Sequence, residues 1–226
     1  MGLKMRTRVK FCGLSSEKDI HDAVAAGADA IGLVLYEKSK RYVPLAQAAA
    51  LRRTVPAFVN AVTLTVNADV QSIEQIMGTV APDFIQFHGD ETGAFCEQFS
   101  YPYIRAIRVG APGLTSPEEI ATAVSDYPSA RAFLFDAYSP AYGGAGISFD
   151  IGLLSQARQI LPAHKIIIAG GLNASNIAAL VSSYRPYAVD LSSGIEIAPG
   201  EKSAGKMRSF MLALSEVDKL HWPVQL

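Results

Sequence analysis

The sequence predicts an α/β fold, a single-domain (β/α)8 barrel of the TIM type, because short β-rich runs alternate with segments of helical periodicity and this alternation repeats eight times. Consecutive strands separated by helices are expected to be parallel, since a parallel pair requires a long crossover. Eight such units suit closure into a barrel. The alternative is an open doubly wound sheet. No linker or break in composition suggests a second domain.

The first half of the chain provides four of these units. Strands are expected at residues 8–13, 30–36, 61–66 and 84–88, and residues 1–7 form an N-terminal extension. Helices are expected to begin at Ser15-Ser16-Glu17, after Pro44, at Asp69 and after Asp90-Glu91. Serine and aspartate are favoured at such positions because their side chains accept hydrogen bonds from the first amides of a helix.

The second half continues the pattern. Strands are expected at residues 103–109, 132–137, 165–170 and 188–193. The clearest helix start is Ser116-Pro117-Glu118-Glu119, with a serine cap, a proline at the first helical position and acids in the first turn. The other helices are expected after Phe149-Asp150, over 173–184 and around 206–216.

Composition limits the classes of protein that the chain can belong to. Its 226 residues are 50% hydrophobic and 18% charged, which is typical of a globular domain with a large core. A net charge of −1 predicts no general attraction to nucleic acid or to anionic membranes. No segment approaches the roughly 20 apolar residues that span a bilayer, and no signal-peptide pattern is present, so a cytoplasmic protein is expected. Cys12 and Cys96 are expected to be free thiols.

Polar and small residues follow the predicted strands where an active site would lie. In a barrel of this type the C-terminal ends of the strands form the active site. The residues at these ends are Cys12, Gly13, Tyr36 with the following E-K-S-K-R, His88, Gly89, Arg108, Asp136, Gly170, Gly171, Ser192, Ser193 and Gly194. The barrel would bring them to one mouth from distant points in the sequence.

Two glycine-containing loops near the end of the chain predict a phosphate site. I-I-I-A-G-G-L-N-A-S-N follows the seventh strand and V-D-L-S-S-G-I-E includes the eighth. Glycine lets the backbone approach a ligand, and helix-opening amides bind anions. Loops after strands seven and eight commonly hold phosphate in this fold. Alternatively, these glycines only make tight turns.

Cys12 and Asp136 are the candidates for proton transfer. Cys12 ends a strand beside Gly13, where its thiolate could act as a base, although free cysteine is also a common core residue. Burial disfavours the charged form of a carboxyl group, which suits Asp136 as a general acid. Asp136 could instead be a partner for Arg108 or a helix cap. Cys96, in a helical pattern, is interpreted as structural.

Arg41 and His88 complete the polar candidates. The planar fork of Arg41 suits a substrate carboxylate, although the cationic run around it could be a solvated loop. His88 could be a ligand, a base or a satisfied hydrogen bonder. The four histidines show no ligand spacing, so no metal site is expected.

Several of these motifs together resemble the phosphoribosylanthranilate isomerase family of tryptophan biosynthesis. They are V-K-F-C-G-L, A-G-A-D-A-I-G-L-V-L-Y-E-K-S-K-R-Y-V, Q-F-H-G-D-E, L-F-D-A-Y…Y-G-G-A-G-I-S-F-D, I-A-G-G-L-N-A-S-N-I and Y-A-V-D-L-S-S-G-I-E…P-G-E-K. They occur in order from Lys10 to about Phe210. The resemblance implies a single-domain barrel that needs neither cofactor nor metal. We expect a monomer or a homodimer.

The resemblance also implies a reaction and a set of roles. N-(5′-phosphoribosyl)anthranilate would undergo an Amadori rearrangement to 1-(2-carboxyphenylamino)-1-deoxyribulose 5-phosphate. Cys12 would be the general base, Asp136 the general acid and Arg41 the ligand of the anthranilate carboxylate. Such a site should favour the thiolate of Cys12. The remaining roles would fall to phosphate-binding residues Gly171, Leu172, Ser193, Gly194, Gly144 and Gly146, and to orienting residues His88 and Asp190.

Departures from the family pattern and competing interpretations remain. The family loop G-G-T-G or G-G-S-G followed by lysine is G-G-A-G-I here, so Ala145 lacks a hydroxyl and Ile147 a cation. The strand-three region, T-L-T-V, also differs, and we assign it no role.

Competing barrels are a ribulose-phosphate epimerase, an indole-glycerol-phosphate synthase and a phosphometabolite-binding protein without catalysis. The metal-binding histidines of the first and the strand-end catalytic lysine of the second are not evident.

Overall fold

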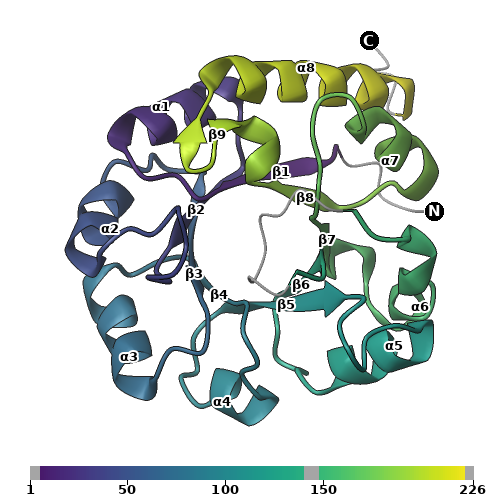
Figure 1. Ribbon diagram of the computed structural model, residues 1–226, viewed down its shortest axis with the longest axis horizontal. Helices are drawn as coiled ribbons and strands as arrows, with labels where there is room; N and C mark the ends of the chain where they lie inside the picture. The colour runs from purple at the N-terminus through teal and green to yellow at the C-terminus, as the bar shows by residue number, and fades with distance from the viewer. Residues whose placement is uncertain (1–5, 140–147, 222–226) are drawn as a thin grey trace.

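The computed structural model of the chain describes residues 6–139 and 148–221. Eight parallel strands close into a barrel in the order in which they occur along the chain, and helices surround it (Figure 1). The fold class expected from the sequence is therefore confirmed. The strands are β1 (Arg8–Cys12), β2 (Ala30–Val34), β3 (Asn60–Thr65), β4 (Phe84–Phe87), β5 (Tyr103–Val109), β6 (Ala132–Ala137), β7 (Ile166–Ile168) and β8 (Ala188–Leu191).

The helices follow the strands, and their starts are explained by local hydrogen bonds. They are α1 (Glu17–Ala26), α2 (Leu45–Arg52), α3 (Val70–Thr79), α4 (Gly93–Glu97), α5 (Pro117–Ser125), α6 (Ala157–Ile160), α7 (Ile177–Tyr184) and α8 (Ala204–His221). Ser16 and Ser116 form capping boxes with Asp19 and Glu119, as the serine signals in the sequence predict. Each box satisfies amides that the first turn of a helix leaves unpaired.

The core has two layers because successive strand residues point to opposite faces. The larger cluster lies between the sheet and the helices and includes the fully buried Phe11, Phe87 and Phe133. A smaller cluster on the other face of the strands fills the barrel interior, with Leu134 and Ile104 among its members. Burial on both faces explains why the strands read as nearly continuous apolar runs.

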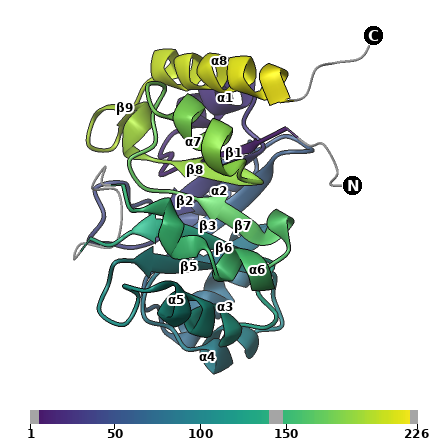
Figure 2. The same ribbon diagram turned by 90° about the vertical axis from the view of Figure 1, so that its right-hand side faces the viewer.

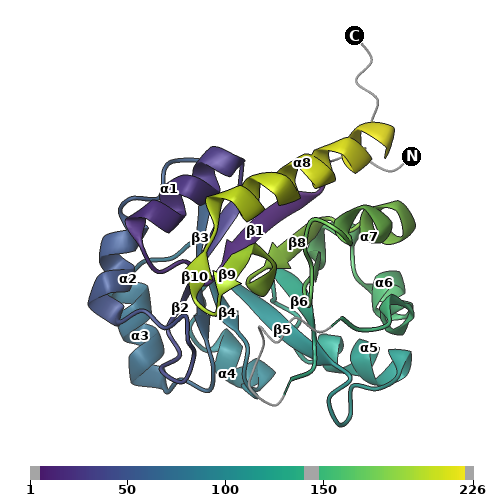
Figure 3. The same ribbon diagram turned by 45° about the horizontal axis from the view of Figure 1, so that its top comes forward.

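The main differences from the expected elements lie after β6. A 3-10 helix, η1 (Ile151–Leu154), precedes a short α6. Helix α7 begins at Ile177 rather than at 173, because the side chains of Asn173 and Asn176 hold residues 173–176 in a turn. A hairpin, β9 (Glu196–Ala198) with β10 (Glu201–Lys202), was not expected and lies between β8 and α8 (Figure 3).

Residues 6 and 7 of the expected N-terminal extension are held against the barrel. The Thr7 amide and hydroxyl donate to the carboxylate of Asp218 in α8, at 3.1 Å each, and Arg6 pairs with Asp29. Thr7 is buried. These two residues therefore belong to the folded domain, and residues 1–5 lie outside the described part of the chain.

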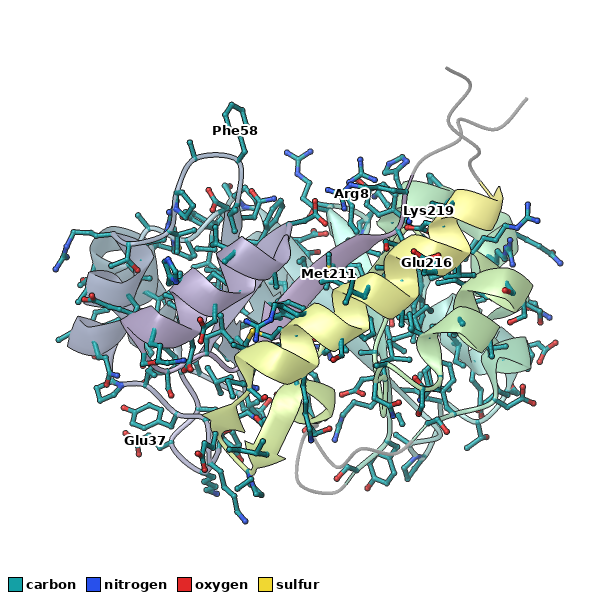
Figure 4. All side chains as sticks on the ribbon, turned by 90° about the horizontal axis from the view of Figure 1, so that it is seen from above. Arg8, Glu37, Phe58, Met211, Glu216 and Lys219 are labelled. Atoms are coloured by element: carbon teal, nitrogen blue, oxygen red, sulfur yellow. The ribbon has the colours of Figure 1, made fainter. Side chains whose placement is uncertain are left out.

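The two ends of the barrel present different segments. Figure 2 shows β9 at one end of the barrel, beyond the ends of the strands. In Figure 4, Glu37 of the segment after β2 lies at one edge of the molecule and the fully exposed Phe58 of the α2–β3 loop projects from the opposite edge. Within residues 6–139 and 148–221, the longest helices are too short or too polar to cross a bilayer.

Candidate active site

A cavity of about 480 Å³ opens at the C-terminal ends of the strands. Residues from six barrel strands or from the segments that follow them line it. They include Cys12, Tyr36, Lys38, Arg41, Leu64, His88, Asp136, Ser139, Asp190, Ser192, Ser193 and Glu196. The cavity therefore brings together the candidates Cys12, Asp136, Arg41, His88, Asp190 and Ser193, which the sequence scatters over more than 180 positions. Convergence of parallel strand ends on one barrel mouth explains this arrangement.

Cys12 is the last residue of β1 and its side chain lies at the bottom of this cavity. The residue is 4% exposed. Lys10, two residues earlier on the same strand and hence on the same face, lies beneath it. The Lys10 Nζ is 2.8 Å from Oδ1 of Asp190 on the neighbouring strand β8. Cys12 thus stands above a buried ion pair.

Gly32 of β2 makes room for these groups. A methyl group added there would lie 2.8 Å from the Cys12 Sγ and 3.1 Å from the Lys10 Nζ. Atoms this close would have to shift, so only glycine leaves the thiol and the ammonium group in their present positions.

The electrostatics of Cys12 differ from the expectation of a site that favours the thiolate. Burial raises the pKa of the Cys12 thiol above its ordinary value, and the positive charge of Lys10 acts in the opposite direction. Burial alone would lower the pKa of Lys10, but the carboxylate of Asp190 raises it. Lys10 is therefore charged, and burial acts on the Cys12 thiol against the expected thiolate while Lys10 acts for it.

Asp136 lies across the cavity on β6 and is buried beside His88. The Nε2 of His88 is 3.5 Å from Oδ2 of Asp136. The other ring nitrogen, Nδ1, is 3.1 Å from Nε2 of Gln86. If the amide of Gln86 donates, Nδ1 accepts and Nε2 carries the proton that faces Asp136. Arg108, the alternative partner of Asp136, forms an ion pair with Asp90.

Arg41 lies in the segment after β2 and is bound to Glu196 of the hairpin. Its Nε and Nη2 donate to the two carboxylate oxygens of Glu196, at 2.7 Å each. Lys202 donates to the same carboxylate at 2.6 Å. These two cations hold the pKa of Glu196 below its ordinary value although burial acts to raise it. Gly13 allows the arginine to lie across the backbone, since a methyl group there would be 2.5 Å from the Arg41 Cδ.

The loops after β7 and β8 meet beside the main cavity. Gly171, Ser193 and Gly194 line a second cavity of about 480 Å³, together with Lys206 of α8. Ser193 lines both cavities, so the two adjoin. Leu172 is buried, and a methyl group at Gly194 would collide with its carbonyl oxygen.

Backbone amides are available in this second cavity. Ser193 and Gly194 begin the 3-10 helix η3 (Ser193–Ile195), and the first amides of a helix have no partner within it. The four phosphate-site candidates Gly171, Leu172, Ser193 and Gly194 are therefore brought together. Gly144 and Gly146, with Ala145 and Ile147, lie outside the described residues. In the described ranges no cluster of three His, Cys, Asp or Glu side chains could hold a metal ion.

Comparisons with known proteins identify the family. The family model for N-(5′-phosphoribosyl)anthranilate isomerase matches residues 9–213. The chain belongs to this family. The isomerase of Bordetella pertussis is 52% identical over 216 residues, which cover 96% of this chain and 99% of the relative. That of Bordetella petrii is 51% identical over 214 residues, 95% of this chain and 97% of the relative.

Solved structures agree with this assignment to the phosphoribosylanthranilate isomerases. The Thermotoga maritima enzyme has a TM-score of 0.82 at 32% identity and covers 93% of this chain and 99% of its own. The Thermus thermophilus enzyme has a TM-score of 0.79 at 32% identity and covers 93% of this chain and 100% of its own. The protein is thus an isomerase that converts N-(5′-phosphoribosyl)anthranilate to 1-(2-carboxyphenylamino)-1-deoxyribulose 5-phosphate in tryptophan biosynthesis.

Three buried residues of the site were missed from the sequence. Lys10 and Gln86 each occur two positions before a candidate, Cys12 and His88, and therefore share its face of the strand. A charged or amide side chain at such a position in an apolar strand is a signal that could have been used. Glu196 follows the S-S-G-I motif directly, but its partner Arg41 is 155 positions away, and no local pattern reveals that pair.

Proposed function

We propose that the isomerisation in this protein is carried out by Cys12 as general base and Asp136 as general acid. The observation that supports this most directly is that both side chains line the same 480 Å³ cavity, from strands on different sides of the barrel. A sugar ring held between a thiol and a carboxyl group can receive a proton on one side and lose one on the other.

In the first step Asp136 donates its proton to the furanose ring oxygen as the bond between that oxygen and C1 breaks. The nitrogen lone pair forms the C1–N double bond, which gives an iminium cation. His88, 3.5 Å from the Asp136 carboxylate, would orient this group. When Asp136 has lost its proton, a protonated His88 Nε2 can donate a hydrogen bond to the resulting carboxylate.

In the second step the Cys12 thiolate removes the proton from C2, whose acidity the adjacent iminium group increases. The electrons of the C2–H bond form the C1–C2 double bond and neutralise the nitrogen. The enolamine then becomes the ketone by loss of the hydroxyl proton and gain of a proton at C1, so the overall reaction is an isomerisation. Burial raises the pKa of Cys12, and the cation formed in the first step therefore favours the thiolate when the base is needed.

The other candidates would bind the two ends of the substrate. Arginine has five N–H donors, so Arg41 keeps donors for the anthranilate carboxylate while Glu196 holds its Nε and Nη2. The phosphate would be bound by backbone amides around Gly171, Leu172, Ser193 and Gly194, with Gly144 and Gly146 as further candidates. Asp190 would hold the Lys10 ammonium group in place beneath the cavity through their ion pair.

The test is a fluorescence assay of the consumption of freshly generated phosphoribosylanthranilate. We expect Cys12→Ser and Asp136→Asn each to lower kcat by about 10²–10⁴-fold. The affinity for reduced 1-(o-carboxyphenylamino)-1-deoxyribulose 5-phosphate, the ligand in the structure of a 29% identical phosphoribosylanthranilate isomerase, should change little. Cys96→Ser is the matched control, because Cys96 is an equally buried thiol in α4, outside the cavity lining. A Cys12→Ser enzyme with wild-type turnover would refute the assignment of the base.

We also propose that the protein acts on its small-molecule substrate in the cytoplasm, as a monomer or homodimer and without nucleic acid. Its two free thiols, Cys12 and Cys96, suit a reducing compartment. A net charge of −1 gives no electrostatic reason to bind nucleic acid. The Thermotoga maritima enzyme, 27% identical with a TM-score of 0.79, is described as dimeric and has been obtained in monomeric forms. Light scattering of the purified chain decides the oligomeric state.

A further inference from the structure

We propose that Lys10 is a positioning residue of this site: its ammonium group is the counter-ion of the Cys12 thiolate, and Asp190 holds that group beneath the sulfur. The inference rests on the proposed role of Cys12 as the base that removes the C2 proton. It adds to that role the group that makes a buried thiol able to ionise.

The geometry of β1 and its two neighbours supports this assignment. Lys10 and Cys12 point to the same face of β1, and both are 4% exposed. The point where a methyl group of Gly32 would stand is 2.8 Å from Sγ and 3.1 Å from Nζ, so the two atoms lie around one small space. The Asp190 carboxylate, 2.8 Å from Nζ, fixes the ammonium group from the other neighbouring strand.

A purely structural ion pair is a weaker explanation for these residues. A lysine and an aspartate buried in the interior of a barrel lose their hydration, and apolar residues of similar volume are often at least as stabilising. The Lys10–Asp190 pair occupies the interior directly below the cavity that Cys12 and Asp190 line. The position of the ion pair beneath the Cys12 thiol gives a reason for charged side chains there, since a positive charge can stabilise the thiolate.

Other charged groups around Cys12 must be considered together with Lys10. Those that line the cavity are Lys38, Lys40 and Arg41 after β2, His88 after β4, Asp136 of β6, Asp190 of β8 and Glu196 of β9. Lys10 of β1 and Lys202 of β10 also act on the charge of Cys12. Arg41 and Lys202 are both bound to Glu196, which neutralises part of their charge. Lys10 has the largest effect among the charges that lower the pKa of Cys12, and Asp190 opposes it.

The experiment measures the ionisation of the Cys12 thiol directly rather than through turnover. The full-length protein is treated with iodoacetamide at a series of pH values, and the rate of Cys12 alkylation is followed by mass spectrometry of the peptide that contains it. Only the thiolate reacts at an appreciable rate. Cys96 provides an internal reference, because burial raises its pKa to about 12.

Three variants are compared with the wild type. Lys10→Met removes the ammonium group and keeps much of the side-chain volume. Gly32→Ala places a methyl group against both the sulfur and the nitrogen, which would have to shift while both remain present. Lys165→Met is the matched control, because Lys165 is a half-buried lysine that donates to the Ala130 carbonyl at the opposite end of β7 from the cavity.

We expect the midpoint of the alkylation profile to rise by about 1–3 pH units in Lys10→Met, the range that an opposite charge at this separation produces. The shift should be smaller and in the same direction in Gly32→Ala, and the Lys165→Met profile should coincide with that of the wild type. The pH at which kcat rises should move in parallel with the alkylation midpoint.

A folded Lys10→Met protein whose alkylation profile coincides with that of the wild type would overturn the proposal. If circular dichroism shows that Lys10→Met does not fold, the Gly32→Ala profile decides in the same way. Failure of the proposed function is distinguishable, because it would appear as undiminished turnover of Cys12→Ser, a measurement that does not depend on the alkylation profiles.

Discussion

Replacing Arg105 by methionine should strongly destabilise the fold, because it leaves a carboxylate buried without its counter-charge. Arg105 is on β5 and faces the helices. Its Nη1 is 2.8 Å from Oε2 of Glu91, and the two side chains are 8% and 3% exposed. The guanidinium also donates to the carbonyl oxygens of Phe87 and Gly89 and lies 4.8 Å above the ring of Tyr127.

The magnitude follows from what remains after the substitution. Glu91 would keep hydrogen bonds from the amides of Asn67 and Gly89, at 2.7 and 2.9 Å, but no cation. Removing one partner of a buried ion pair lowers the free energy of unfolding by about 3–5 kcal/mol. For a chain of this length, each kcal/mol of lost unfolding free energy lowers Tm by roughly 2–4 °C. We therefore expect Tm to fall by about 6–20 °C.

Urea denaturation and thermal melting followed by circular dichroism measure this effect, and two further variants test its cause. Arg52→Met is the matched control, because the Arg52–Asp83 pair is 3.3 Å apart and about one-third exposed; its effect should stay below about 1 kcal/mol. Arg105→Met combined with Glu91→Gln should be more stable than Arg105→Met alone, since no buried charge is left. The reasoning would be refuted if the double variant were no more stable than the single one.

Three further outcomes are expected. Thr63→Val or Thr65→Val should raise the free energy of unfolding by about 1 kcal/mol in urea titrations, because both hydroxyls are buried without a hydrogen-bond partner in the described structure; a loss of stability would contradict this. Ser116→Ala should lower Tm by roughly 2–4 °C, because it removes the cap of α5. The pKa of Glu196 is lowered in the folded protein. The stabilisation of the fold by its carboxylate should therefore be present at pH 7 and disappear as the pH falls below about 4. The stability difference between wild type and Glu196→Gln should therefore shrink on acidification, and a difference independent of pH would argue against an ionised Glu196.

The barrel and the position of its mouth could be predicted from the sequence because the signals for them are local. Alternation of strand and helix patterns, and caps such as Ser16 and Ser116, depend on neighbouring residues only. Placing Cys12 and Asp136 in one cavity required only that parallel strand ends converge. These parts of the prediction did not depend on how any two strands are aligned.

The polar partners inside the site could not be predicted, because they depend on strand register and on loop conformation. Lys10 and Asp190 are 180 positions apart and meet only because the barrel closes between β1 and β8 with these two residues opposite each other. Arg41 meets Glu196 because the β9–β10 hairpin turns toward the segment after β2. Periodicity carries no information on either alignment.

The ion pair under the cavity limits how far this barrel can be stabilised by redesign. Four interior positions near the mouth are occupied by charged and polar side chains, Lys10, Asp190, Gln86 and His88, instead of apolar ones. Selection for heat resistance alone should replace Lys10 and Asp190 by aliphatic side chains and, on the role proposed for Lys10, yield a more stable barrel that is less active at neutral pH. A thermostable working variant is better sought on the outer layer, between the sheet and the helices, where the packing is already apolar.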